Sequence, residues 1–354
     1  MKRFLKNTIL FFLLYLGLST LLSFCLPYHW GNPWYSVKIQ FLKQESKHEW
    51  NTYFFGSSRV HDQIDPKRFD ELVNKQTEEE IHSFNLGAQG TFPPQSYFLF
   101  EEFLDSRLSE GVKYCFLEVR EVARLLPANR TPPNHSYWMN IKELSFVLPM
   151  VLSDSTTSLA YKQTQVIRNL TGYVKNMLHL GHFAAQLTNP NYYDEACLGP
   201  EKNGFLPLEY QYETTNDPVL RAALSKKRQL LEEKPENLDR RRHRHLEGHL
   251  VDSAVYYSEI HRDRLLRMIE SAKGKGIQLI LLYISSGPNQ APERAIQLLR
   301  SLPKANVIDL ADPAKYPELF AIENAFDIGH LNDQGSRIFT THLANQFIRL
   351  STAE

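Results

Sequence analysis

The sequence predicts an α/β protein with a mostly parallel central sheet, one apolar helix at its N-terminus and a largely helical insertion. Short apolar runs alternate with longer stretches of helical spacing, which is the pattern of parallel strands joined by crossover helices. Two of the runs, residues 112–119 and 277–284, are almost continuously apolar, as expected for strands whose two faces are both covered. An uncharged apolar stretch at residues 7–28 predicts the separate N-terminal helix.

The positions of strands and helices follow from this alternation. The predicted strands are residues 50–55, 81–86, 112–119, 277–284 and 305–310. The predicted helices are residues 94–109, 256–273, 291–302 and 334–350. Between residues 129 and 250 the alternation gives way to Pro-rich, Asn-rich and long polar helical segments, which predict a mainly helical insertion or cap.

The N-terminal stretch predicts a transmembrane anchor. Lys2, Arg3 and Lys6 precede the uncharged residues 7–28, which just reach the ~20 apolar residues needed to cross ~30 Å of hydrocarbon. The cations favour a cytoplasmic N-terminus, so everything after Tyr28 is expected outside the cytoplasm, in the periplasm or at the cell surface. We interpret residues 1–28 as an uncleaved signal anchor, residues 29–49 as a juxtamembrane linker and residues 50–354 as the main domain.

Three alternatives remain for this stretch. A cleaved secretory signal would need small residues at its cleavage site, and residues 23–27 offer a poor one. A lipoprotein signal would use Cys25, but Phe24 is large for the position before the acceptor cysteine. A buried core helix is the third alternative, and the flanking cations disfavour it.

Composition disfavours several classes of function. Lys plus Arg and Asp plus Glu each number 40, so the chain has no general field for nucleic acid, and no nucleic-acid partner is expected. The three cysteines do not suggest a disulfide framework, although a bridge between Cys115 and Cys197 is left open. Nothing in the sequence predicts a cofactor.

His243, His245 and His249 raise the hypothesis of a metal site, because pairs of them lie at helical spacing. Metal ligation usually also needs a carboxylate or cysteine and supporting hydrogen bonds. The interleaved arginines disfavour a divalent cation, so the segment predicts a solvated basic helix face and no metal. Such a face suits an anionic polysaccharide or lipid headgroups.

Ser58 is the candidate nucleophile. It follows the first predicted strand, and the carboxyl ends of parallel strands meet in the crevice where reactive groups of α/β proteins lie. Gly56 permits a sharp turn, and a helix starting near residue 59 would aim backbone N–H groups at a developing oxyanion. The turn is not G-x-S-x-G, which excludes the nucleophile elbow of the α/β-hydrolases.

Asp327 and His330 are the candidate acid and base. They lie three residues apart on a predicted irregular loop, where the carboxylate can hold the imidazole that accepts the proton of a serine. Asn332 or Asp333 then caps the final helix.

Three short blocks resemble, in order, the SGNH/GDSL hydrolase superfamily: Gly56-Ser57-Ser58-Arg59, Asn85-Leu86-Gly87 and Asp327-x-x-His330-Leu-Asn-x-x-Gly335. The likeness is greatest to the membrane-anchored branch, the proteins similar to DltD and to alginate O-acetylation proteins. It covers about residues 50–126 and 250–350. The resemblance implies a flavodoxin-like three-layer fold, with Ser58 as nucleophile, His330 as general base and Asp327 as its orienting acid.

The same resemblance implies an oxyanion hole built from the N–H groups of Ser58 and Gly87. One departure concerns a further donor, which the family often takes from an Asn after the next strand. Residues 117–121, with the sequence Leu-Glu-Val-Arg-Glu, stand there instead. Arg120 is a candidate for the missing donor or for binding an anionic substrate, or it pairs with Glu118 or Glu121. Loss of one oxyanion donor costs ~10²–10³ in rate.

These observations predict an extracytoplasmic serine esterase or O-acyltransferase that acts on acyl esters, acetyl above all, of a cell-envelope glycan. The resemblance implies a membrane-bound O-acyltransferase as a partner. One alternative is a catalytically inactive SGNH-like accessory protein that binds glycan or scaffolds an envelope-modification complex. A thioesterase or phospholipase-like role at the membrane surface is the remaining alternative.

Overall fold

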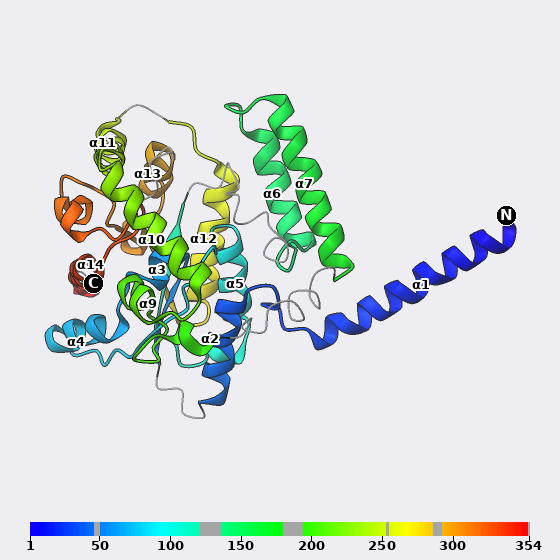
Figure 1. The fold of residues 1–354 in the computed structure, drawn as a ribbon, viewed down its shortest axis with the longest axis horizontal. Coiled ribbons are helices and arrows are strands. Elements are labelled where there is room, and N and C mark those ends of the chain that lie inside the picture. The colour runs from blue at the N-terminus through cyan, green and yellow to red at the C-terminus, as the bar shows by residue number, and fades with distance from the viewer. Residues whose placement is uncertain (46–49, 121–135, 180–193, 253–254, 286–291, 353–354) are drawn as a thin grey trace. The chain divides into compact units, whose positions relative to one another are not determined.

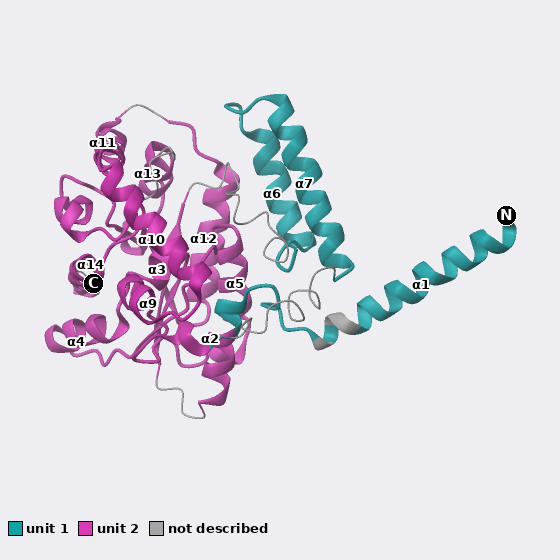
Figure 2. Ribbon diagram, in the orientation of Figure 1, with its two compact units in different colours: residues 1–36, 125–194 teal, residues 37–124, 195–354 magenta. Residues whose placement is uncertain are grey.

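The computed structural model describes all residues except 46–49, 121–135, 180–193, 253–254, 286–291 and 353–354 (Figure 1). The chain forms two compact units (Figure 2). One comprises Met1–Ser36 and Leu125–Asp194, and the other comprises Val37–Arg124 and Glu195–Glu354.

The larger unit is built on a five-stranded parallel sheet with the order β2-β1-β3-β4-β5. Its strands are β1 (Thr52–Phe55), β2 (Ser83–Asn85), β3 (Tyr114–Val119), β4 (Gln278–Tyr283) and β5 (Val307–Asp309). Each lies inside a strand predicted from sequence, so the α/β prediction is confirmed. The order is that of flavodoxin-like sheets, in which the chain reverses direction across the sheet at β1 and β3.

The strand register explains why these runs are apolar. Phe54 of β1 stands beside Phe116 of β3, which stands beside Ile280 of β4, and all three are buried on one face. Phe69 of α4 (Pro66–Gln76) and Phe347 of α14 (Asp333–Ser351) cover that face, with ring centroids 5.2 Å from Phe54 and 5.5 Å from Phe116 respectively. Because side chains alternate along a strand, the neighbours of these residues face the opposite side.

Helix α5 (Gln95–Leu104) covers the opposite face. Its Phe100 and Phe103 lie 5.3 and 5.0 Å from the ring of Phe55. Helix α12 (Glu259–Lys273) packs beside α5, where Arg264 pairs with Glu101 at 2.8 Å. Helices therefore lie on both faces of the sheet. The other helices of this unit are α2 (Pro33–Gln44, which begins in the smaller unit), α3 (Ser58–His61), α9 (Leu208–Thr214), α10 (Pro218–Glu233), α11 (Glu236–Leu250) and α13 (Pro292–Arg300).

Two predicted segments differ from what the structure contains. Residues 29–49 were expected as a linker, but α2 occupies most of them and buries Tyr35, Ile39 and Leu42. The predicted insertion at residues 129–250 is mainly helical where it is described, yet it does not form one body. Its first part belongs to the smaller unit, whereas α9, α10 and α11 belong to the unit that holds the sheet.

The smaller unit contains α1 (Lys2–Cys25), α6 (Ile141–Ser153) and α7 (Leu159–Met177). Helix α1 is long and apolar enough over Lys2–Leu21 to cross a membrane, and only 6% of that window is buried. An internal core helix would be mostly buried, so this alternative for α1 is wrong.

Cys115 and Cys197 are both buried free thiols. The bridge left open between them does not form.

Phe116→Ala tests the central aromatic layer. Removing this ring leaves a cavity beside Phe54, Phe69 and Phe347, and we expect the free energy of unfolding to fall by ~3–5 kcal/mol. Denaturant unfolding in detergent measures it. The control is Ile322→Ala, at a side chain that is 51% exposed, which should change stability by less than ~0.5 kcal/mol. Equal effects of the two variants would contradict the described core.

Candidate active site

The turn after β1 presents Ser58 at the carboxyl end of the sheet. Ser57 caps α3 by accepting a hydrogen bond from the Arg59 N–H at 3.3 Å, so α3 begins at Ser58. Gly56 is required here, since a Cβ would lie 2.5 Å from Val60 Cγ2 and 2.7 Å from Glu118 Oε2. The site lies where β1 and β3 meet, which is where open α/β sheets bind ligands.

A tight loop before α14 carries Asp327 and His330. The Asp327 Oδ1 atom accepts hydrogen bonds from the N–H groups of Gly329 at 2.6 Å and His330 at 2.8 Å. Asn332 then caps α14 by accepting a bond from the Gly335 N–H at 2.8 Å. The Asp327 carboxylate thus stabilises the loop through its backbone N–H groups and helps to position His330.

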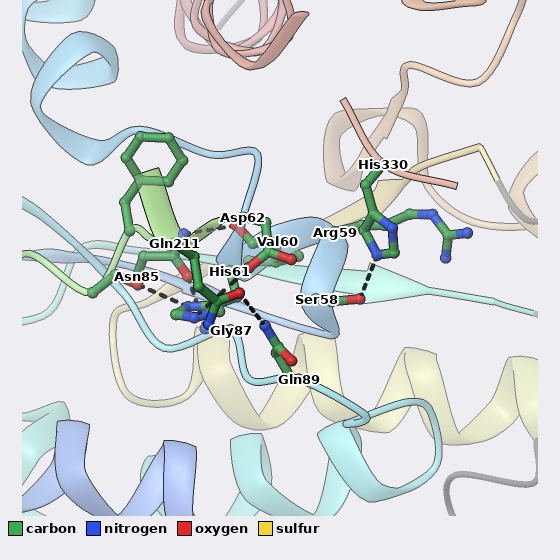
Figure 3. A network of polar contacts seen from close by, with 12 residues as sticks. Ser58, Arg59, Val60, His61, Asp62, Asn85, Gly87, Gln89, Gln211 and His330 are labelled. Carbon is green, nitrogen blue, oxygen red and sulfur yellow. Dashed lines mark hydrogen bonds and ion pairs between the residues drawn. The ribbon is translucent and has the colours of Figure 1, made fainter. Parts of the chain in front are cut away.

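Ser58, His330 and Asp327 meet in one chain of polar contacts. Ser58 Oγ lies 2.8 Å from His330 Nε2, although the two residues are 272 positions apart (Figure 3). On the other side of the ring, His330 Nδ1 lies 2.9 Å from Asp327 Oδ2. All three residues predicted as catalytic therefore lie together, in the order nucleophile, base and orienting acid.

The surroundings set the charge of this chain. Burial lowers the pKa of the His330 imidazole below its ordinary value, and Asp327 only partly opposes that effect. Burial also opposes ionisation of Asp327, but His330 and the Gly329 N–H outweigh it and hold the pKa of this carboxyl well below its usual range. Near neutral pH the pair is therefore a carboxylate beside a neutral imidazole, which is the state that accepts a proton.

Two buried arginines hold the carbonyl groups of the same loop. Arg59 Nε donates to the Gly329 carbonyl at 3.0 Å, and Arg241 Nη1 of α11 donates to the Ile328 carbonyl at 3.0 Å. Arg241 Nη2 also bonds Ser285 Oγ. Burial, reinforced by the nearby charge of Arg59, lowers the pKa of Arg241 to about 9. Neither arginine was singled out from the sequence.

Gly87 does not offer the N–H group expected of it. That N–H donates to Asn85 Oδ1 at 2.9 Å, while the Gly87 carbonyl accepts from Lys38 Nζ at 2.6 Å. The prediction of Gly87 as an oxyanion donor is therefore wrong for this conformation, because the Asn85 side chain occupies the group. In the part of the chain that the structure describes, the Ser58 N–H makes no hydrogen bond.

Arg120 forms the ion pair that the sequence left open. Its Nε donates to Glu118 Oε1 at 2.6 Å, and its guanidinium lies 4.7 Å from the centroid of the Phe92 ring. The other oxygen of Glu118 accepts from the Ser57 N–H at 2.6 Å. The Nη2 atom of Arg120 is buried and has no partner among the described residues. Glu118 thus joins Arg120 to the turn that carries Ser58.

A buried lysine, Lys38, bonds to groups beside the site, and the sequence did not predict this role. Lys38 Nζ of α2 lies 2.8 Å from His61 Nδ1 and donates to the carbonyls of Gly87 and Gly204 at 2.6 and 2.7 Å. Burial lowers the pKa of Lys38 to about 7. Its position inside a segment that resembles a linker gave no signal of this role.

The basic segment of α11 is only partly solvated, contrary to the sequence prediction. Arg241 and His245 are buried, and His249 Nε2 bonds Asp309 Oδ2 at 2.9 Å. His243 is exposed and pairs with Glu247 at 3.4 Å. Among the residues that the structure describes, no three His, Cys, Asp or Glu side chains gather where they could hold a metal ion.

A serine hydroxyl bonded to an imidazole that is itself held by a carboxylate can perform nucleophilic acyl transfer. Comparison with protein-family models, with curated proteins and with solved structures found no match to this chain.

Glu118→Gln tests the buried ion pair. The variant leaves Arg120 as a buried charge without its carboxylate, and we expect a loss of ~3–5 kcal/mol in unfolding free energy. Adding Arg120→Met should recover part of the loss. As a control, Glu79→Gln breaks the surface pair with Lys113, which is 50% exposed, and should cost under ~1 kcal/mol. Equal losses from the buried and the surface pair would contradict the role assigned to Glu118.

Proposed function

We propose that this protein is a membrane-anchored serine esterase or O-acyltransferase acting on acyl esters of a cell-envelope glycan. The observation that carries the proposal is the contact chain from Ser58 Oγ through His330 to Asp327, at 2.8 and 2.9 Å. Two sequence segments 272 residues apart supply it. The resemblance to the membrane-anchored SGNH branch supports the substrate class and a membrane-bound O-acyltransferase as a partner.

The proposed reaction has two steps. Ser58 Oγ attacks the acyl carbonyl while His330 Nε2 takes its proton, and that proton then goes to the departing sugar oxygen, which leaves an acyl-serine. In the second step His330 takes a proton from water or from an acceptor hydroxyl, whose oxygen attacks the acyl carbonyl. His330 then gives that proton to Ser58 Oγ as the acyl bond to the serine breaks, which regenerates the free enzyme. Asp327 stays ionised throughout and holds the imidazole. Water yields hydrolysis, whereas a sugar hydroxyl yields transfer.

The oxyanion is assigned to two donors. The Ser58 N–H lies at the start of α3 and has no acceptor in the described chain. It belongs to the same residue as the attacking Oγ, so its position is fixed together with that of the nucleophile. Arg120 supplies the second donor, because its Nη2 atom is buried, unpaired and held through Glu118 to the adjacent Ser57. A guanidinium in this place would substitute a full charge for the amide dipole of the absent asparagine.

The apolar helix α1 supports the proposed location. In the proposed topology Lys2, Arg3 and Lys6 stay on the cytoplasmic side of an uncleaved α1, and the sheet unit lies outside the cytoplasm. A glycan of the cell envelope is then within reach of the site.

An inactive accessory protein is the second candidate, and one observation favours it. The Gly87 N–H is occupied by Asn85 at 2.9 Å, which removes one of the expected oxyanion donors. In that case the site binds a glycan without turning it over.

Ser58→Ala separates the two candidates. The wild-type protein should react with a fluorophosphonate probe and hydrolyse small acetyl esters, and the variant should lose the labelling and at least ~10³ of the rate. Ser57→Ala is the control, because its hydroxyl caps α3 and does not face His330, so labelling should persist. Unchanged labelling of the Ser58 variant would exclude it as the nucleophile, and an unreactive wild type would favour the accessory function.

The pH profile tests the base. His330 must be neutral to accept a proton, so kcat/KM should be constant at higher pH and fall as the pH drops through the pKa of His330. Because that pKa lies below its ordinary ~6.5, the midpoint of the acid limb should fall below ~6.5. Asp327→Asn removes a charge that raises this pKa, so it should move the midpoint lower and reduce the rate by ~10²–10⁴. A wild-type midpoint above ~6.5 would contradict the lowered pKa of His330, and an acid limb that Asp327→Asn leaves in place would contradict His330 as the base.

A further inference from the structure

Helix α7 has its apolar and polar side chains on the opposite sides from those expected of a helix in water. The residues that it buries are Gln165, Asn169 and Gly172. Its large apolar side chains are exposed instead: Leu159 by 71%, Ile167 by 65%, Leu170 by 42%, Val174 by 43% and Met177 by 45%. At 3.6 residues per turn these five lie on one stripe about 80° wide. We call them the α7 stripe.

Burying polar residues of α7 while exposing its apolar ones is unfavourable for a helix surrounded by water. The side-chain oxygens of Gln165 and Asn169 are buried and have no hydrogen-bond partner in the described chain. An exposed apolar stripe of this length, interrupted by the exposed Gln163 between Leu159 and Ile167, indicates a surface that something apolar covers. The outward-facing apolar side chains of α7 would therefore be stable in an apolar environment and not in water.

Contacts with α1 indicate which solvent that is. Tyr15 Oη donates to the Leu178 carbonyl at 2.9 Å, and Ser19 Oγ donates to the Met177 carbonyl at 3.0 Å. Ser19 Oγ also lies 2.7 Å from His179 Nδ1. Tyr15 and Ser19 are one turn apart, inside the Lys2–Leu21 segment that is long and apolar enough to span a membrane. The C-terminal end of α7 is therefore bonded to α1 at the level of the hydrocarbon segment.

The charges of α7 agree with a lipid surface. Lys162, Arg168 and Lys175 are its only charged residues, and it contains no Asp or Glu. Arg168 and Lys175 lie about 80–100° beyond the edge of the α7 stripe, and Lys162 lies about 60° beyond its other edge. Cations beside an apolar stripe are the pattern of helices that lie in a bilayer interface, where long basic side chains reach the headgroups.

We propose that α7 lies in the membrane interface, with the α7 stripe buried among the acyl chains of the outer leaflet beside α1. The occupant of the stripe is lipid, because the helix that bonds to its end is itself the proposed membrane span. The inference rests on α1 being that span, and not on the chemistry of Ser58. It gives the protein a second membrane contact that the composition of the whole chain does not reveal.

Depth-dependent quenching tests this. An environment-sensitive NBD fluorophore is attached to Leu170→Cys or Val174→Cys in the full-length chain carrying Cys25→Ser, since Cys115 and Cys197 are buried. The protein is reconstituted into vesicles of phosphatidylcholine and phosphatidylglycerol, with or without doxyl-labelled lipid. The controls are Thr164→Cys and Thr171→Cys, at exposed positions of α7 outside the stripe.

We expect blue-shifted emission at positions 170 and 174, with quenching by doxyl lipid several-fold greater than at 164 and 171. Equal, water-like emission at all four positions, in protein that still floats with vesicles after alkaline carbonate washing, overturns the proposal and leaves the α1 anchor intact. Shielded emission that doxyl lipid does not quench overturns it in favour of a protein partner such as a second copy. Protein that does not float at all excludes the anchor and the lipid contact together, whereas fluorophosphonate labelling of Ser58 stays a separate measurement.

Discussion

The buried carboxylate of Glu118 joins the two central strands at the end of the sheet where the candidate site lies. One oxygen accepts the Ser57 N–H at 2.6 Å and the other accepts Arg120 Nε at 2.6 Å, so the end of β3 is bonded to the turn after β1. Gly56 is needed because a Cβ would collide with this carboxylate. Burial raises the pKa of Glu118, and Arg59 and the Ser57 N–H oppose that effect. The position of Ser58 thus depends on a charge that the protein must keep paired, because an unpaired buried charge is strongly destabilising.

A second set of contacts holds His330, and Arg59 belongs to it. This residue follows Ser58 on α3 (Figure 3), and its Nε donates to the Gly329 carbonyl in the loop of Asp327 and His330. The nucleophile turn and the base loop are therefore joined both by the contact between Ser58 and His330 and by a hydrogen bond beside it. A positioning bond of this kind limits how far the imidazole can move from the hydroxyl, and such precision accounts for much of the power of a triad.

The sequence was sufficient for what depends on local pattern and insufficient for what depends on which side chain faces which. The five strands were predictable because strands covered on both faces are apolar runs, and the Asp327 loop because its spacing matches its chemistry. The acceptor of the Gly87 N–H was not predictable, since it is the side-chain oxygen of Asn85 two residues earlier. Arg241 and His245 were expected in solvent because their segment is so basic. One face of α11 is nevertheless buried in the sheet unit, and that face takes every third or fourth residue, whatever its charge. Lys38 was hidden in the same way, within an apparent linker.

The connection between α1 and α2 is short. Seven residues, 26–32, separate the end of α1 from the start of α2, and a fully extended segment of that length spans at most ~25 Å. Helix α2 is part of the sheet unit from Val37 onward, where Lys38 bonds Gly87 and Gly204. Where α1 spans the bilayer, as proposed, this short connection limits how far the start of α2 can move from the membrane. The proposed acyl chemistry therefore suits esters that are presented at the membrane, such as those on a glycan handed over as it emerges.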